Sequence, residues 1–133
     1  MKRSSGISTL IGVLVLVVSL FLVAGPCSAD ESSAAVPQVP AKGMVTMVDL
    51  GASGCIPCMM MSSIVDSLQK QYKGKAAIYF INIRNHPEEG QKFGINLIPT
   101  QIFYNKNGKE VYRHEGVMLK GAIISKLEEL GVK

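Results

Sequence analysis

The residues best suited to chemistry in this 133-residue chain are two cysteines separated by isoleucine and proline, in the run Cys55-Ile56-Pro57-Cys58. A cysteine thiolate attacks disulfides, and a second cysteine one helical turn away can close a disulfide with the first. A disulfide that closes so short a loop constrains the unfolded chain little, so chemistry explains the pair better than stability does. The alternatives are a purely structural disulfide and half of a zinc site. Zinc normally takes four ligands, and the chain's two histidines fall in separate predicted elements.

The pair lies where a predicted strand is followed by a predicted helix. Residues 44–50 are almost continuously apolar, which predicts a short strand covered on both faces, and residues 51–54 break it. Apolar residues then recur at helical spacing at Met61, Ile64, Val65, Leu68 and Tyr72. At the start of that helix, unpaired amide groups and the positive end of the helix dipole favour a thiolate at Cys55, and Pro57 suits the first turn. This setting favours redox chemistry for the pair.

Asp49 is the only charged residue in the apolar run over 44–50. Burial of an unpaired carboxylate is costly, so we expect a raised pKa for this group. Because Asp49 precedes Cys55 by six residues, it is also a candidate to exchange a proton with Cys58. The alternative is that Asp49 points outward at the strand end and caps the following loop.

The rest of the chain predicts the elements that complete a domain around the pair. A second apolar run indicates a strand over 76–83, and Pro87 with a terminal Gly94 indicates a short helix. Residues 100–105 and 109–113 flank an Asn-Gly turn, and residues 119–130 again show helical spacing. The order β-α-β-α-β-β-α predicts an α/β fold, with a four-stranded mixed sheet and helices on both faces.

The first 29 residues are typical of an export signal. Lys2 and Arg3 precede an apolar run over 7–24, and small residues follow up to Ala29. An uncleaved membrane anchor and a lipoprotein with its lipid on Cys27 are the alternatives, and all three place the domain outside the cytoplasm. Residues 30–43 are rich in Ser, Ala, Pro and Val, which predicts a flexible linker before a domain over 44–133.

Composition excludes two classes of protein. Hydrophobic residues make up 47% of the chain, which argues against wholesale disorder. The net charge is only +4, no long basic run is present and tryptophan is absent, so we expect no nucleic-acid partner.

The motifs together resemble thioredoxin-like proteins over about residues 44–132. The matching runs, in order, are Val48-Asp49-Leu50, Cys55-Ile56-Pro57-Cys58, Phe93-Gly94-Ile95, Ile98-Pro99-Thr100, Asn107-Gly108 and Gly116. The resemblance implies that Cys55 is the exposed nucleophile, Cys58 the resolving thiol and Asp49 the buried acid. It further implies that Pro99 is a cis-proline that shields the cysteines from metal, and that the backbone of Ile98 pairs with an extended substrate.

The surface expected to meet the substrate comprises Gly54, Ile56, Pro57 and Met59, together with Ile98 and Pro99. Thioredoxin-like proteins usually carry tryptophan where this chain has Gly51 and Gly54, so we expect a flatter and less aromatic surface around Cys55. An exposed Met59 beside a reactive thiol can contact unfolded substrates adaptably. It can also be a tolerated surface residue, or complete a soft Cu(I) site with the two cysteines.

These features together predict a thiol–disulfide oxidoreductase at the periplasm or outer face of the membrane. Ile-Pro between the cysteines lacks the histidine of strongly oxidising relatives and resembles reducing thioredoxins, which favours a reductase over an oxidase or isomerase. The implied partners are disulfide-containing exported proteins, a membrane thiol reductase as electron donor and, by analogy with cytochrome c maturation, apocytochrome c. We expect a monomer with no cofactor beyond the Cys55–Cys58 disulfide and no metal. A Cu(I)-binding module is the rival from another class.

Overall fold

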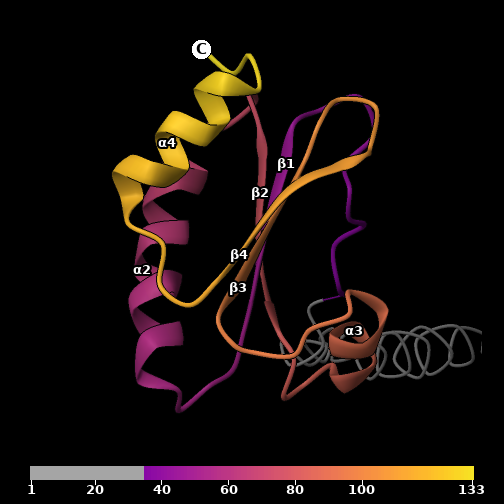
Figure 1. Cartoon of the computed structure of the whole chain (residues 1–133), viewed down its shortest axis with the longest axis vertical. Helices are drawn as coiled ribbons and strands as arrows, with labels where there is room; N and C mark the ends of the chain where they lie inside the picture. Colours follow the sequence, from indigo (N-terminus) through magenta and orange to yellow (C-terminus); the bar gives the residue numbers. More distant parts are fainter. Residues whose placement is uncertain (1–34) are drawn as a thin grey trace, which may run out of the picture. The chain divides into compact units, whose positions relative to one another are not determined.

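The computed structural model describes residues 35–133, and Figure 1 shows the path of the chain. The elements of this part follow the predicted order: β1 (Thr46–Gly51), α2 (Ile56–Gln71), β2 (Ala77–Asn82), α3 (Pro87–Lys92), β3 (Thr100–Tyr104), β4 (Glu110–Glu115) and α4 (Lys120–Glu129). The strands form one mixed sheet in the order β2-β1-β3-β4. Strand β1 pairs parallel with β2 and antiparallel with β3, which in turn pairs antiparallel with β4. The predicted four-stranded mixed sheet is confirmed.

The two faces of the sheet carry separate cores because successive side chains of a strand point to opposite sides. One core packs Met47 and Phe103 of the sheet against Met61 and Leu68 of α2 and Leu127 of α4. In Figure 1 these two helices lie along the same side of the sheet, with α3 on the other. The second core, on the side of α3, consists of Val48, Leu50, Ile81, Phe93, Ile102 and Tyr104. Helices therefore cover both faces, as predicted.

Strand β4 extends two residues beyond the predicted end, to Glu115 opposite Thr100. It is an edge strand with mostly exposed or half-buried residues, so its outer part lacks the apolar run by which the other strands are recognised.

The described part of the predicted linker packs against the domain. Val36 and Val39 are half-buried against the second core, and the backbone N–H of Ala41 donates a hydrogen bond to Thr46 Oγ1 at 3.0 Å. Residues 36–41 are thus held to the fold, where the sequence suggested a flexible segment. The predicted export signal over 1–29 lies outside the described residues. Within 35–133, none of the helices is both long and apolar enough to span a bilayer.

Candidate active site

Cys55 occupies the N-cap of α2, where the sequence placed it. Its Sγ accepts a hydrogen bond from the backbone N–H of Cys58 at 3.3 Å, and Pro57 stands in the first turn. A disulfide joins Cys55 to Cys58, with their Cα atoms 5.2 Å apart. A sulfur at this position faces helix amide groups, which stabilise negative charge on it when the disulfide is reduced.

The two cysteines differ in exposure. Cys55 is half-buried at the surface, whereas Cys58, in the first turn of α2, is only 1% exposed. A macromolecular disulfide can therefore reach Cys55 and not Cys58. This asymmetry fits an attacking residue at 55 and a resolving residue at 58.

Asp49 is fully buried and does not point outward at the strand end. It shares a face of β1 with Met47 and Gly51, because these residues alternate along the strand. This is the face covered by α2: a Cβ added to Gly51 would lie 3.1 Å from the Cβ of Cys58. Burial raises the pKa of Asp49 to about 6, against the opposing effect of a hydrogen bond from Gln101.

Gln101 is a site residue that the sequence interpretation did not include. It lies opposite Asp49 in the β1–β3 register, and its Nε2 donates a hydrogen bond to Asp49 Oδ1 at 2.7 Å. The sequence did contain a signal, since Gln101 is a polar residue in a predicted strand that is otherwise mostly apolar, as Asp49 is.

The same pair leaves two oxygens free of hydrogen bonds. Among residues 35–133, Asp49 Oδ2 and Gln101 Oε1 are buried side-chain oxygens with no partner. An ionised Asp49 uses the Gln101 N–H, whereas a protonated Asp49 needs an acceptor for its own O–H, which Gln101 Oε1 can supply. The pair is therefore chemically suited to hold or release one proton.

The residues predicted to meet a substrate are accessible around Cys55, with Pro99 as the exception. Ile56 and Met59 are 76% and 61% exposed, and Gly54 and Pro57 are also exposed. Met60 is exposed as well, and Leu97 adds another exposed apolar side chain that the sequence did not single out.

Ile98 and Pro99 lie at the same end of the sheet as the cysteines. Thr100, the next residue, pairs with Leu50 near the end of β1, from which the cysteine loop departs. The Ile98–Pro99 peptide bond is cis, as the resemblance implied. Pro99 is buried, and its carbonyl accepts a hydrogen bond from the N–H of Gly116 at 2.8 Å. Of the two residues before it, Ile98 is half-buried and Leu97 is exposed.

A hollow of about 130 Å³ lies beside Cys58 and is lined by Ala52, Ser53, Cys58, Met59, Ser62 and Phe80. Gly51 is next to two residues of this lining, Cys58 and Phe80. A Cβ at position 51 would come within 2.9 Å of Phe80 Cε2. The Phe80 ring thus occupies space next to Cys58 that a side chain at position 51 would need.

We therefore expect Gly51→Ala to lower the free energy of unfolding by about 1–3 kcal/mol, since the added methyl group overpacks the contact between Phe80 and Cys58. Urea denaturation of the oxidised protein measures the change. Gly121→Ala is the matched control, because a Cβ on Gly121 in α4 meets open space. It should stabilise the protein by about 0.5 kcal/mol through helix propensity. Equal effects of the two substitutions would contradict the steric argument.

The structure also bears on the metal predictions. Within the described residues, no three side chains among His, Cys, Asp and Glu gather as a candidate cation site. The Cu(I) alternative, with Met59 as a ligand, stays a prediction. Met59 and Cys58 line the same hollow, whereas Cys55 does not line it.

Comparison with known proteins identifies the family. The family model described as Thioredoxin matches residues 30–129. Thioredoxin 2 of Chlorobaculum tepidum is 38% identical over 85 residues, which cover 64% of this chain and 77% of the relative. The chloroplastic M-type thioredoxin of Pisum sativum is 37% identical over 83 residues, covering 62% of this chain and 48% of that one. The structure of Fasciola hepatica thioredoxin superposes with a TM-score of 0.59 at 26% identity, covering 66% of this chain and 82% of that one.

The disulfide at the N-terminus of α2, the cis-proline loop beside it and these matches agree with one another. The chain therefore belongs to the thioredoxin family and is a thiol–disulfide oxidoreductase.

Proposed function

We propose that this protein acts outside the cytoplasm and reduces disulfides in exported proteins. One observation carries the chemistry: a disulfide at a helix N-terminus whose first sulfur belongs to a surface residue and whose second belongs to a buried one. The location rests on the sequence of residues 1–29, where a basic start, an apolar run and small residues are typical of export.

The reaction begins with the dithiol form. The Cys55 thiolate attacks one sulfur of the substrate disulfide, so that the substrate S–S bond breaks, a mixed disulfide forms and one substrate sulfur leaves as a thiolate. Cys58 then gives its proton to Asp49 and attacks Cys55 Sγ, which forms the Cys55–Cys58 disulfide and releases the second substrate thiolate. Two electrons pass from the protein to the substrate. A membrane thiol reductase is the class of partner that returns them.

Substrate binding falls to the surface around Cys55. The backbone of Ile98 pairs with an extended segment of the substrate, beside Pro99. The exposed side chains of Ile56 and Met59 contact apolar groups near the substrate cysteine, while Gly54 and Pro57 leave space for its backbone. No cofactor beyond the disulfide takes part, and the protein acts as a monomer.

The direction of electron flow rests on the two residues between the cysteines. Strongly oxidising relatives place histidine there, which stabilises the thiolate and hence the reduced form. Ile56 and Pro57 carry no donor of that kind. This favours a reductase over an oxidase or isomerase. Apocytochrome c, which presents a pair of cysteines for haem attachment, is a substrate of suitable chemistry.

A trapping experiment in the native cell envelope tests the proposal. In Cys58→Ser the first attack still occurs but the mixed disulfide cannot be resolved, so we expect exported proteins bound covalently to Cys55 and released by dithiothreitol. The double variant Cys55→Ser/Cys58→Ser is the control and should trap none. An abundant Cys58→Ser variant that carries no disulfide-linked partner would overturn the proposal.

The same cells also report the direction of electron flow. Acid quenching followed by alkylation should find the wild-type pair mainly as thiols, because a reductase is kept reduced by its electron donor. A pair found mainly as the disulfide would instead identify an oxidase.

A further inference from the structure

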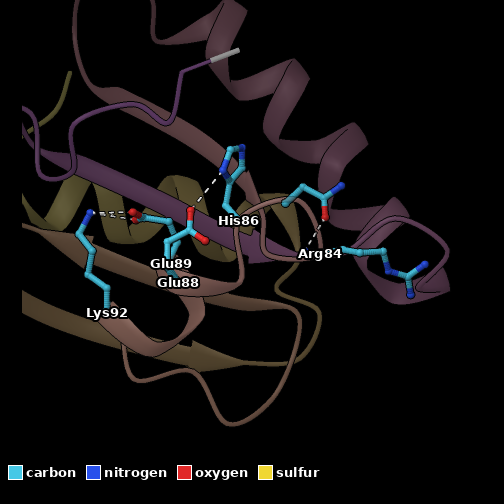
Figure 2. Close-up of polar contacts among 6 residues, drawn as sticks. Arg84, His86, Glu88, Glu89 and Lys92 are labelled. Carbon is cyan, nitrogen blue, oxygen red and sulfur yellow. Dashed lines mark hydrogen bonds and ion pairs between the residues drawn. The ribbon is translucent and has the colours of Figure 1, made fainter. Parts of the chain in front are cut away.

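The β2–α3 connection places a cation beside the cysteine loop. Arg84 follows β2, and its Nη1 lies 3.7 Å from the position that a Cβ on Gly54 would occupy, one residue before Cys55. Figure 2 shows the Arg84 side chain extending away from His86, Glu88, Glu89 and Lys92, toward a neighbouring segment of the chain. The guanidinium therefore lies at the edge of the surface to which a substrate disulfide must come.

The Asn82 side chain holds Arg84 and the cysteine loop together through two hydrogen bonds. Its Oδ1 accepts a hydrogen bond from the backbone N–H of Arg84 at 3.0 Å, and its Nδ2 donates one to Ser53 Oγ at 2.6 Å. One side chain thus connects the base of Arg84 to the loop that leads into Cys55. The backbone of Arg84 is held relative to that loop, and the side chain needs only its own rotamers to approach a ligand.

Among the described residues, the Arg84 guanidinium has no hydrogen-bond or ion-pair partner, in contrast to His86, Glu88, Glu89 and Lys92 of the segment that follows it. Glu89 is paired with Lys92 at 2.9 Å, and Glu88 lies 3.4 Å from His86. Arg113, the other arginine of the described chain, binds both carboxylate oxygens of Glu110 and the carbonyl of Phe93. Within residues 35–133, no acceptor therefore competes with an external group for the donors of Arg84, and Glu88 and Glu89 are already engaged with His86 and Lys92.

We propose that Arg84 determines substrate specificity by binding a carboxylate next to the reacting cysteine of a protein substrate. A guanidinium presents several N–H donors in one plane, which match the two oxygens of a carboxylate. The exposed Ile56 and Met59 would contact apolar parts of the same segment, with the acidic residue on the Arg84 side. The proposal deepens the proposed function and rests on it, because it concerns the substrates of the same reductase.

Three peptides test the inference, each with one internal disulfide and identical except for Glu, Gln or Lys on both sides of one cysteine. The enzyme is the full-length protein with Cys27→Ser, so that Cys55 and Cys58 are its only thiols. It is reduced, mixed with peptide, quenched in acid and alkylated, and mass spectrometry follows its oxidation. At low ionic strength we expect the Glu peptide to react about threefold to tenfold faster than the Gln peptide, and the ratio to shrink with added salt.

The variants separate Arg84 from general effects on Cys55. Arg84→Gln should bring the Glu-to-Gln rate ratio close to one, and Arg84→Glu should make the Lys peptide the fastest. Lys106→Gln is the matched control, because Lys106 lies in the β3–β4 turn at the far end of the sheet and should leave the ratio unchanged. A change in the thiolate content of Cys55 alters all three rates together and cancels in the ratio.

The outcomes are distinct for the two proposals. A Glu-to-Gln ratio that is the same in wild type and Arg84→Gln would overturn the role of Arg84 while leaving the reductase intact. Failure to reduce even the Gln peptide would instead count against the proposed function. A preference for oxidised glutathione over the Glu peptide, abolished by Arg84→Gln, would show that the carboxylate belongs to a small thiol and would overturn the assignment to a protein substrate.

Discussion

Cys55→Ser should abolish reduction of protein disulfides, with a rate at least about a thousandfold below that of wild type. The serine hydroxyl is not ionised at neutral pH, even at the N-terminus of α2 where the structure places Cys55 Sγ. The buried Cys58 cannot substitute for it, since it is only 1% exposed and a protein disulfide has no access to it. Insulin precipitation in the presence of dithiothreitol measures the loss.

Two further variants make this result specific. Cys58→Ser should complete the first exchange with a substrate and then stop, giving a mixed disulfide in place of turnover. Cys27→Ser, which changes the remaining cysteine of the chain, should keep full activity. Substantial turnover by Cys55→Ser would show that the chemistry does not begin at this residue.

Asp49→Asn should stabilise the oxidised protein by about 3 kcal/mol at pH 8 and by little at pH 4. The pKa of Asp49 is raised to about 6 in the fold, against 3.8 as its ordinary value. Between these pH values the folded state binds more protons than the unfolded state, so wild-type stability falls as the pH rises through this window. Asparagine stays neutral, and its amide N–H can donate to the unpartnered Gln101 Oε1. Urea denaturation at a series of pH values measures the difference.

Asp66→Asn is the control for this prediction, because it removes one exposed carboxylate on α2 and leaves the buried site unchanged. Gln101→Leu should raise the pKa of Asp49 further, because it removes the hydrogen bond that favours the charged form of this carboxyl group. The pKa can be measured from the NMR chemical shift of the Asp49 carboxyl carbon as a function of pH. If the free energy of unfolding changed equally with pH in wild type and Asp49→Asn between pH 4 and pH 8, the raised pKa of Asp49 would be contradicted.

The sequence predicted the parts of the site that depend on local patterns. The helix beginning after Cys55 follows from apolar spacing and from Pro57 in its first turn, and the buried strand around Asp49 follows from its continuous apolar run. The local sequence also predicted that backbone amide groups at the start of the helix would lie near Cys55 Sγ. These inferences need no knowledge of what lies across the sheet.

The parts that the sequence did not predict depend on contacts between distant segments. Gln101 meets Asp49 only through the β1–β3 register, and Arg84 meets Gly54 only through the way the end of β2 lies against the cysteine loop. The packing of Val36 and Val39 onto the second core likewise opposes a local signal, since proline-rich composition favours an extended linker. In each case tertiary packing determines the outcome.

The hydrogen bond between Asp49 and Gln101 joins positions 52 residues apart and links the two central strands of the sheet. During synthesis the two cysteines are added to the chain well before β3. A growing chain therefore contains both thiols while Asp49 still lacks its hydrogen-bond partner Gln101. The buried pair of Asp49 and Gln101 therefore forms only when β3 pairs with β1. Fragments that end before Gln101 should consequently contain both cysteines and Asp49 but lack the hydrogen bond that favours the charged form of Asp49.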